Sequence, residues 1–527
     1  MLAVKKWRIE SRTMLMHIQR RFRKKGCIAP MRPYHLTSRK CLKFHHIIDR
    51  ATKVTNTDRA KEYFDIAYPP VYGTRWPSIR LALSSKQKYV AVVNNFANHE
   101  VTVEKFQELG AMDIRHKYSY FAERLRARKE EINEKKSQEG EEDTSQDEDG
   151  PKNSKLIRTS LLELDDDALA ARANAEPISR YPEEYRRRAL AQDHVPGTAE
   201  LDYISRVILP SEVGSAGISA MMDYVPATKL KGLEDWIEET DVFLDASQGD
   251  QDIGLQIEKQ EEPINLPSML KIYAFNKTDI SDFPKPKMDH HMKLLDYYAL
   301  DGASLLPVLA LDLAPGDRVL DLCAAPGGKT LIALQSLLPG VVVSNDISDS
   351  RVQRIRGVLR QYIPNNFSGF ENVSVVKKSN GCDFKEKEAY DKVLVDAPCL
   401  IDRVSMQEDD NSIFKTTRTK ERLKLPELQS QLLVSALQAV RPGGTVVYST
   451  CTLTPLQNDG VVHLALSRIW QETTIECSVV DMTYAVRSWS FLYRFGNNLG
   501  LRYGQVVLPS LLSNFGPMYC AKIRRLK

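Results

Sequence analysis

Short apolar, often β-branched runs alternate with amphipathic segments through residues 270–527, which predicts a sheet flanked by helices. The runs that predict strands are Arg318–Leu322, Val341–Asn345, Val373–Val376, Lys392–Asp396 and Thr445–Ser449. The segments with helical spacing are Thr330–Leu338, Ser350–Tyr362 and Pro426–Val440. Because alternating strands and helices require right-handed crossovers, we expect an α/β fold with a parallel sheet. Any ligand site should then lie beyond the carboxyl ends of the strands.

The pattern before residue 270 divides into two parts. Residues 59–125 predict a small, mostly helical N-terminal unit, whose apolar positions we expect to be buried: Trp76, Ile79, Leu81, Leu83, Tyr89, Val92, Val93 and Phe96. Residues 126–265 predict an acidic, largely disordered insert. Within that insert, residues 130–149 hold ten acids and two bases, and residues 233–262 hold eleven acids and one base. Such charge runs without periodicity are typical of solvated segments.

The amino-terminal segment has the opposite charge. Residues 1–48 carry 13 basic residues and one acid, although the whole chain has a net charge of only +4. This composition predicts a mitochondrial presequence, with a nuclear-import patch or an RNA-binding arm as the alternatives. A basic body with acidic inserts suits a nucleic-acid partner.

Two classes of protein are excluded by simple patterns. The sequence has no run of 18 apolar residues, so no transmembrane helix is predicted. Eight cysteines without a C-x-x-C pair argue against a disulfide scaffold and a zinc ribbon, so we predict free thiols and no metal site.

A glycine-rich loop follows the first predicted strand of the α/β region. The sequence there is DLCAAPGGKT, from Asp321 to Thr330. Its Gly-Lys-Thr end resembles a P-loop, but that motif requires glycine at position 323, where cysteine stands. Asp346 closes the second strand, where a carboxylate can bind the two ribose hydroxyls of a nucleoside ligand. An ordinary tight turn with a solvated acid is the alternative interpretation.

Two cysteines follow neighbouring predicted strands. Cys399 comes shortly after Lys392–Asp396, and Cys451 comes shortly after Thr445–Ser449. A single buried cysteine is usually an inert small hydrophobe. Two of them beside a nucleoside site indicate nucleophilic chemistry, provided that nearby positive charge lowers the thiol pKa from about 8.5.

Together these segments resemble the Sun (Nop2/Sun-domain) family of RNA cytosine-5 methyltransferases. The resemblance covers residues 270–527 and rests on DLCAAPGGKT, DAPC and PGGTVVYSTCTLTPLQND. The segments CLIDRVS, NSIFK, NFGPMY, WPSIR and VNNF are similar to the mitochondrial ribosomal-RNA member of that family. Two departures are that Leu400 and Ile401 replace the usual small polar residues after the first cysteine, and that Gln457-Asn458-Asp459 replaces a Glu-Asn-Glu-like run.

The resemblance implies a Rossmann-like methyltransferase sheet over residues 270–527 that binds S-adenosylmethionine. The cofactor would lie against Ala325, Pro326, Gly327, Gly328 and Lys329. Asp346 would bind the ribose with Arg351 nearby, and Asp396 would lie beside the methionine end and the target base. Either Asn380 or Asp383 would contact the adenine, and the sequence leaves these two open.

The resemblance also implies a mechanism and a setting. Cys451 would be the nucleophile, Cys399 would release the product, and Asp396 would stabilise the activated ring. The implied substrate is mitochondrial small-subunit ribosomal RNA, methylated in the matrix in support of mitoribosome assembly. A helical-repeat protein of the mitochondrial transcription-termination-factor type is the implied partner. The alternatives are a ribosome-assembly or RNA-binding factor whose methylation is dispensable or lost, and, more distantly, thiol redox chemistry.

Overall fold

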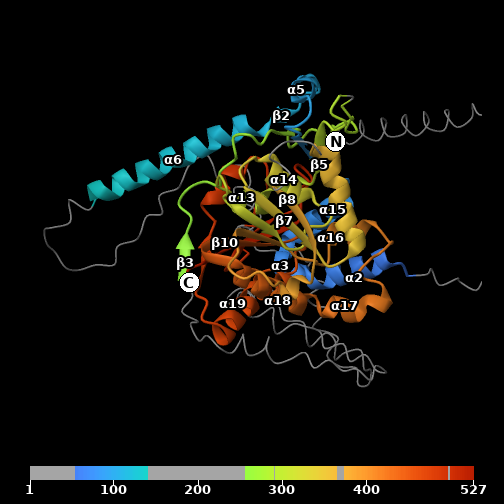
Figure 1. The fold of residues 1–527 in the computed structure, drawn as a ribbon, viewed down its shortest axis with the longest axis vertical. Coiled ribbons are helices and arrows are strands. Elements are labelled where there is room, and N and C mark those ends of the chain that lie inside the picture. The colour runs from blue at the N-terminus through green and yellow to red at the C-terminus, as the bar shows by residue number, and fades with distance from the viewer. Residues whose placement is uncertain (1–53, 140–255, 290, 365–372, 497–498) are drawn as a thin grey trace, which may run out of the picture. The chain divides into compact units, whose positions relative to one another are not determined.

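The computed structural model describes residues 54–139, 256–289, 291–364, 373–496 and 499–527, which form two β-sheets and their covering helices (Figure 1). The larger sheet has the strand order β3-β11-β13-β10-β9-β6-β7-β8, with β12 beside β13. Its strands are β3 (Gln256–Lys259), β6 (Arg318–Asp321), β7 (Val341–Asp346), β8 (Ser374–Lys378), β9 (Tyr390–Asp396), β10 (Val440–Thr450), β11 (Cys477–Asp481), β12 (Gly504–Val507) and β13 (Met518–Arg525).

The predicted Rossmann-like core is confirmed by the five strands from β10 to β8, which are all parallel. The expected helices are also present, as α14 (Gly328–Gln335), α15 (Asp349–Tyr362) and α18 (Leu425–Ala439). The sheet continues beyond these five strands, and the expectation of a parallel sheet is wrong there, because β13 runs antiparallel to β10, β11 and β12. The chain doubles back there from β12 into β13, and a return of this kind pairs strands in opposite directions.

Alternate residues of the central strands face two different cores. Val393 and Val395 of β9 join one cluster, whereas Leu394 between them joins the other. This period of two leaves both faces of the sheet apolar, as expected for a sheet covered by helices on both sides. The first core includes α18 and α19 (Asp459–Glu472), and the second includes α13 (Leu305–Ala310), α14 and α15.

The smaller sheet joins the N-terminal segment to the rest of the chain. Its order is β2-β4-β1-β5, formed by β1 (Val90–Val93), β2 (Met112–Asp113), β4 (Ile272–Ala274) and β5 (Tyr297–Leu300). β1 pairs antiparallel with both β4 and β5. Residues 59–125 therefore share a sheet with residues that follow the insert. The expected burial of Leu81 and Tyr89 is wrong, since their exposed fractions are 55% and 45%.

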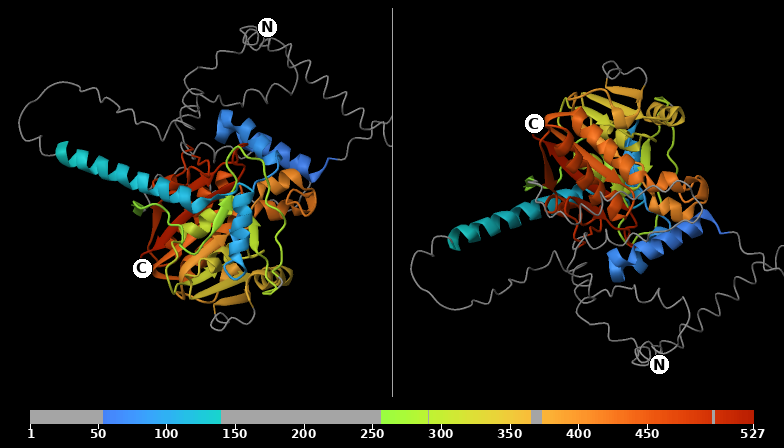
Figure 2. Two further views of the ribbon diagram at one scale, coloured as in Figure 1. Left: turned by 90° about the horizontal axis from the view of Figure 1, so that it is seen from above. Right: turned by 90° about the horizontal axis from the view of Figure 1, so that it is seen from below.

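Aromatic side chains attach the first helices to the rest of the described chain. These helices are α2 (Asn56–Ala67), α3 (Pro69–Tyr72) and α4 (Trp76–Ser84), and α2 and α4 contact α16 (Asp402–Gln407). The rings of Phe64 and Phe414 meet edge to face at 5.3 Å, and Phe64 stacks on Tyr68 at 5.0 Å. Figure 2 shows α2 beside α17 (Thr419–Leu423), and the Arg422 guanidinium of α17 lies 4.7 Å from the Phe414 ring centre.

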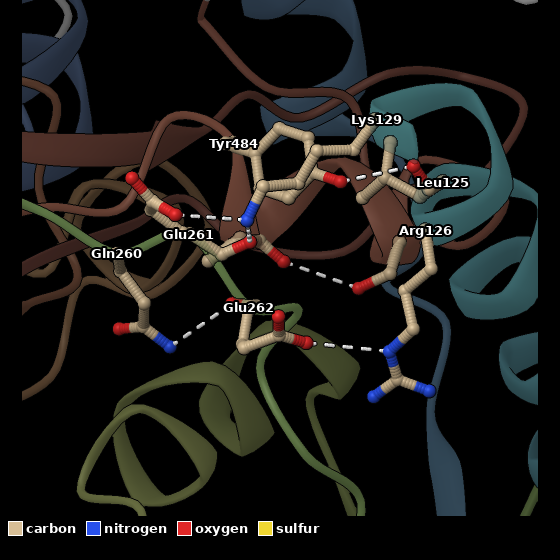
Figure 3. A network of polar contacts seen from close by, with 9 residues as sticks. Leu125, Arg126, Lys129, Gln260, Glu261, Glu262 and Tyr484 are labelled. Carbon is tan, nitrogen blue, oxygen red and sulfur yellow. Dashed lines mark hydrogen bonds and ion pairs between the residues drawn. The ribbon is translucent and has the colours of Figure 1, made fainter. Parts of the chain in front are cut away.

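A described helix and a described strand extend into the two ends of the predicted insert, residues 126–265. Helix α6 (Ile114–Glu139), which follows α5 (His99–Glu108), continues beyond residue 125, and β3 begins before residue 265. Figure 3 shows why these ends are ordered: Lys129 pairs with Glu261 at 2.9 Å, Arg126 pairs with Glu262 at 3.3 Å, and the Tyr484 hydroxyl donates to the Leu125 carbonyl. Such contacts between distant segments cannot be deduced from local composition.

Some predictions fall on residues that the structure does not describe. The predicted presequence, residues 1–48, lies outside the described residues, as does the insert between residues 140 and 255. Among the helices that are described, none combines the length and the apolar composition that a membrane span requires.

Candidate active site

The glycine loop connects β6 to α14 at the carboxyl edge of the sheet. Gly327 precedes α14 with a φ of 109°, a left-handed conformation that glycine adopts without strain. A Cβ added at Gly328 would lie 2.9 Å from the Tyr298 hydroxyl oxygen. Within the predicted cofactor loop, residues 325–329, Gly327 therefore permits the turn into α14 and Gly328 leaves room for the Tyr298 side chain.

Asp321 closes β6 beneath this loop and is 2% exposed. Its Oδ2 accepts a 2.7 Å hydrogen bond from the Thr330 hydroxyl, whereas its Oδ1 is buried without a partner in the described part of the chain. Burial raises the pKa of Asp321 to about 7. No role was predicted for Asp321 from the sequence. Its position as an acid at the end of the first strand, next to the glycine loop, could have indicated a ligand contact.

Asp346 occupies the corresponding position at the end of β7, the parallel neighbour of β6. Its side chain is 4% exposed and its Oδ1 accepts a 3.0 Å hydrogen bond from the Ser348 amide. The Arg351 guanidinium lies 3.4 Å away. The structure therefore brings the predicted ribose acid and its arginine together, next to Asp321.

The two candidates for the adenine contact have different environments. The Asn380 side-chain oxygen accepts a 3.1 Å hydrogen bond from the Cys382 amide and so caps η3 (Gly381–Asp383). Asp383 is exposed and pairs with Lys385 at 2.6 Å. Both Asn380 and Asp383 therefore stay predicted adenine contacts.

Asp396 ends β9 and is held by two side chains. The Lys329 ammonium lies 2.7 Å from Oδ2, and the Ser449 hydroxyl donates to Oδ1 at 2.9 Å. Burial alone would lower the pKa of Lys329, but the attraction of Asp396 outweighs it and the pKa is raised. Lys329 therefore stays charged inside the site. The sequence analysis assigned this lysine only to cofactor binding.

Cys399 and Cys451 meet directly, as their positions at neighbouring strand ends predicted. Their Sγ atoms lie 3.2 Å apart, and the Cys451 amide donates to the Cys399 sulfur at 3.4 Å. The hydrogen bond that the Cys451 thiol shares with Cys399, together with burial, raises the pKa of Cys451 well above its ordinary value, and the nearby Lys329 charge offsets this only in part. The expected lowering of the thiol pKa is thus not found in the free protein.

A buried carboxylate, Asp402, ties the two cysteine loops together. It is fully buried at the start of α16, three residues after Cys399. Its Oδ2 accepts 2.8 Å hydrogen bonds from the Tyr68 hydroxyl and from the Leu453 amide, which lies two residues after Cys451. The sequence analysis did not single out Asp402 or Tyr68.

The Gln457-Asn458-Asp459 departure has a structural role. The Gln457 side-chain oxygen accepts from the Leu400 amide at 3.2 Å, so it connects the second cysteine loop to the first. Asn458 accepts from the Thr450 hydroxyl. Asp459 accepts from the Tyr519 hydroxyl and thereby reaches β13. Hydrogen bonds of these three side chains therefore connect the two cysteine loops to each other and to β13.

The acidic and glycine residues fit S-adenosylmethionine, the cofactor that the resemblance implies. This molecule carries a positive sulfonium and two ribose hydroxyls. Asp321 has a buried Oδ1 without a partner in the described part of the chain, and Asp346 presents a second carboxyl group at the neighbouring strand end, so both can accept hydrogen bonds from this ligand. Within the described ranges no group of three or more metal-ligating side chains is present.

Comparison with known proteins agrees with this chemistry. Residues 308–497 match the model of the 16S rRNA methyltransferase RsmB/F family. The chain is 34% identical to the 5-cytosine rRNA methyltransferase nsun-4 of Caenorhabditis elegans over 90% of this chain and 93% of that protein. It is 34% identical to the Xenopus laevis 5-cytosine rRNA methyltransferase NSUN4, over 90% and 92%. A zebrafish (Danio rerio) mitochondrial tRNA (cytosine(34)-C(5))-methyltransferase is 39% identical over 46% of this chain and 64% of that protein.

Proposed function

The chain belongs to the RsmB/F (Sun) family of S-adenosylmethionine-dependent RNA cytosine-5 methyltransferases, and on that basis we propose that it methylates mitochondrial small-subunit ribosomal RNA. The observation that carries the chemical part of this proposal is the contact between Cys399 and Cys451, beside the Lys329–Asp396 ion pair. The relatives that match over nearly their full length are named as rRNA cytosine methyltransferases. They support ribosomal RNA as the substrate.

The reaction needs a nucleophile because carbon 5 of cytosine is weakly nucleophilic. Bound S-adenosylmethionine supplies an electrophilic methyl group. The Cys451 sulfur forms a bond to carbon 6, which raises the electron density at carbon 5 so that carbon 5 takes the methyl group. The thiol proton that Cys451 loses before the attack goes to solvent. Cys399 then helps to transfer the carbon-5 proton to solvent, and the electron pair left behind restores the double bond of the ring. The carbon–sulfur bond breaks with its electrons on Cys451, which takes a proton back from solvent, so that one proton is released overall.

The raised pKa of Cys451 fits this order of events. In the free protein Cys451 is a protonated thiol in contact with Cys399. Because the thiolate is the reactive form, this protonation limits the reaction of Cys451 with other electrophiles. Attack then requires the 3.2 Å contact between the sulfurs to open and the thiol proton to leave. Of the two charged neighbours, Lys329 favours the Cys451 thiolate, whereas the carboxylate of Asp396 opposes it. We assign to Asp396 the stabilisation of the activated ring through its nitrogen edge.

The setting is proposed to be the mitochondrial matrix, in support of mitoribosome assembly. The basic segment at residues 1–48 and a relative named as a mitochondrial tRNA methyltransferase support a mitochondrial location. A helical-repeat protein of the mitochondrial transcription-termination-factor type remains the proposed partner.

The test is to map 5-methylcytosine across cellular RNA after depletion and after rescue with either wild type or Cys451→Ala. We expect one small-subunit rRNA position in mitochondria to lose methylation and to recover only with wild type. Loss confined to transfer RNA would replace the proposed substrate. Loss of mature small subunits that Cys451→Ala restores would favour an assembly factor whose methylation is dispensable.

A further inference from the structure

Ile401, two residues after Cys399, has an unusual backbone conformation. Its φ is 51° and its ψ is 60°, in the left-handed region. A β-branched side chain is strained there because its Cβ crowds the backbone. Among the residues that the structure describes, Leu337 is the other aliphatic residue with a positive φ, and Leu337 is not β-branched.

Local helix geometry explains Leu337 but not Ile401. Leu337 follows the last residues of α14, where helices commonly end in a left-handed residue. Ile401 instead precedes the first residue of α16, and its side chain makes no capping hydrogen bond. Residues at that position usually have extended backbone and a polar side chain.

Hydrogen bonds on both sides impose the strain. The Leu400 amide donates to Gln457, the Ser405 amide donates to the Ile401 carbonyl at 2.9 Å, and the Asp402 amide donates to the Cys451 carbonyl at 3.4 Å. Leu400 and Asp402 are buried, whereas Ile401 is 43% exposed. The surroundings therefore turn an apolar side chain outward, at the edge of the two-cysteine site.

A second exposed apolar side chain follows within α16. Val404, three residues on, is 42% exposed. Strained backbone conformations are found mostly at functional sites, and here the strained residue does not bury its side chain. Burial of apolar surface thus does not account for the conformation of Ile401.

The proposed reaction has a physical requirement that Ile401 can meet. A cytosine must leave its base stack before a thiol can reach carbon 6, and unstacking costs free energy. Nucleic-acid-binding proteins offset this cost by inserting apolar side chains between bases. Resting on the proposed function, we propose that Ile401 is a wedge that enters the RNA stack where the target cytosine leaves it, with Val404 supporting its outer edge.

Two variants with matched backbone relief test this role. Ile401→Gly removes the wedge and relieves the strain. Leu337→Gly relieves a left-handed aliphatic residue that is 41% exposed and lies just beyond the end of α14. We expect both variants to unfold at a higher temperature than wild type. Ile401→Asn, a polar residue that tolerates this conformation, provides a second variant without the wedge.

The substrates are two RNA fragments with the same target cytosine, one fully paired and one lacking the opposite nucleotide. For Ile401→Gly and Ile401→Asn we expect kcat/KM to fall at least about tenfold on paired RNA and to stay within about twofold on the unpaired fragment. Leu337→Gly should match wild type on both. 2-Aminopurine placed next to the target should brighten on binding wild type and not on binding Ile401→Gly.

Each other result overturns the wedge. Equal losses on both fragments would mean that Ile401 contacts the target base or shapes the cysteine loop. Full activity of the variants on paired RNA would mean that it has no role. If wild type methylated neither fragment while it bound the cofactor, the proposed function would fail together with the wedge.

Discussion

The Tyr68 hydroxyl donates a 2.8 Å hydrogen bond to the buried carboxylate of Asp402, although the two residues are 334 positions apart in the chain. Tyr72 adds a second link, because its hydroxyl donates to the Leu453 carbonyl at 2.6 Å. The Leu453 amide donates in turn to Asp402. The first helices of the described chain therefore support the loop that carries Cys451.

Removing the Tyr68 hydroxyl should weaken both stability and catalysis. Tyr68→Phe leaves the Asp402 oxygen with one donor fewer, and loss of a buried hydrogen bond to a charged group costs about 1–3 kcal/mol. We expect the free energy of unfolding to fall by that amount in urea titrations, and kcat to fall more than KM rises. Tyr120→Phe, on the exposed part of α6, is the matched control and should change neither quantity. Unchanged kcat in Tyr68→Phe would show that this bond does not position Cys451.

The same carboxylate should give stability a defined pH dependence. Burial raises the pKa of Asp402 from 3.8 to about 6. The folded protein then holds this proton more tightly than the unfolded chain, so the contribution of Asp402 to stability falls as the pH rises from about 4 to about 6. Relative to Asp402→Asn, wild type should therefore lose on the order of 3 kcal/mol over that interval, at 1.36 kcal/mol per pKa unit. Urea titrations at several pH values measure the difference, and a constant difference would contradict the raised pKa.

Asp346 should be required for cofactor affinity. Asp346→Ala removes a carboxylate that can bond two ribose hydroxyls, and each charge-assisted bond contributes about 1.5–3 kcal/mol. We expect the Kd for S-adenosylmethionine, measured by calorimetry, to rise at least about tenfold. Asp349→Ala, an exposed acid three residues later that pairs with Lys378, should bind the cofactor normally. If folded Asp346→Ala bound S-adenosylmethionine as tightly as wild type, the ribose would not bind at this strand end.

The two cysteines should differ in whether they trap RNA. Cys451→Ala removes the attacking sulfur, so no methyl transfer and no covalent protein–RNA species should form. Cys399→Ala keeps the attacker and loses the group that resolves the adduct. It should accumulate a complex that survives denaturant and is sensitive to ribonuclease, visible on a gel.

The pattern of trapping decides the assignment. Trapping by Cys451→Ala alone would reverse the two roles. If neither variant traps RNA and both bind cofactor normally, the covalent mechanism loses its main support. Cofactor binding by each variant is the control for misfolding.

Strand ends and the motifs attached to them could be predicted from the sequence, because they depend on local patterns. The predicted end of β9 at Asp396 is that of the structure, and the contact of Cys399 with Cys451 follows from parallel neighbouring strands. The role of Asp402 could not be predicted, since its partners Tyr68 and Leu453 come from distant segments. The left-handed backbone of Ile401 could not be predicted either, because it is imposed by the bonds that the Leu400 and Asp402 amides donate to Gln457 and Cys451.

The pairing of β1 between β4 and β5 has a consequence for the continuity of the polypeptide. β1 precedes the insert and both of its partners follow it, so hydrogen bonds and a shared core join the two halves independently of the peptide chain between residues 139 and 256. A single cut in that interval should yield two fragments that copurify as one folded particle. The same two fragments, produced separately, are natural candidates for reconstitution by complementation.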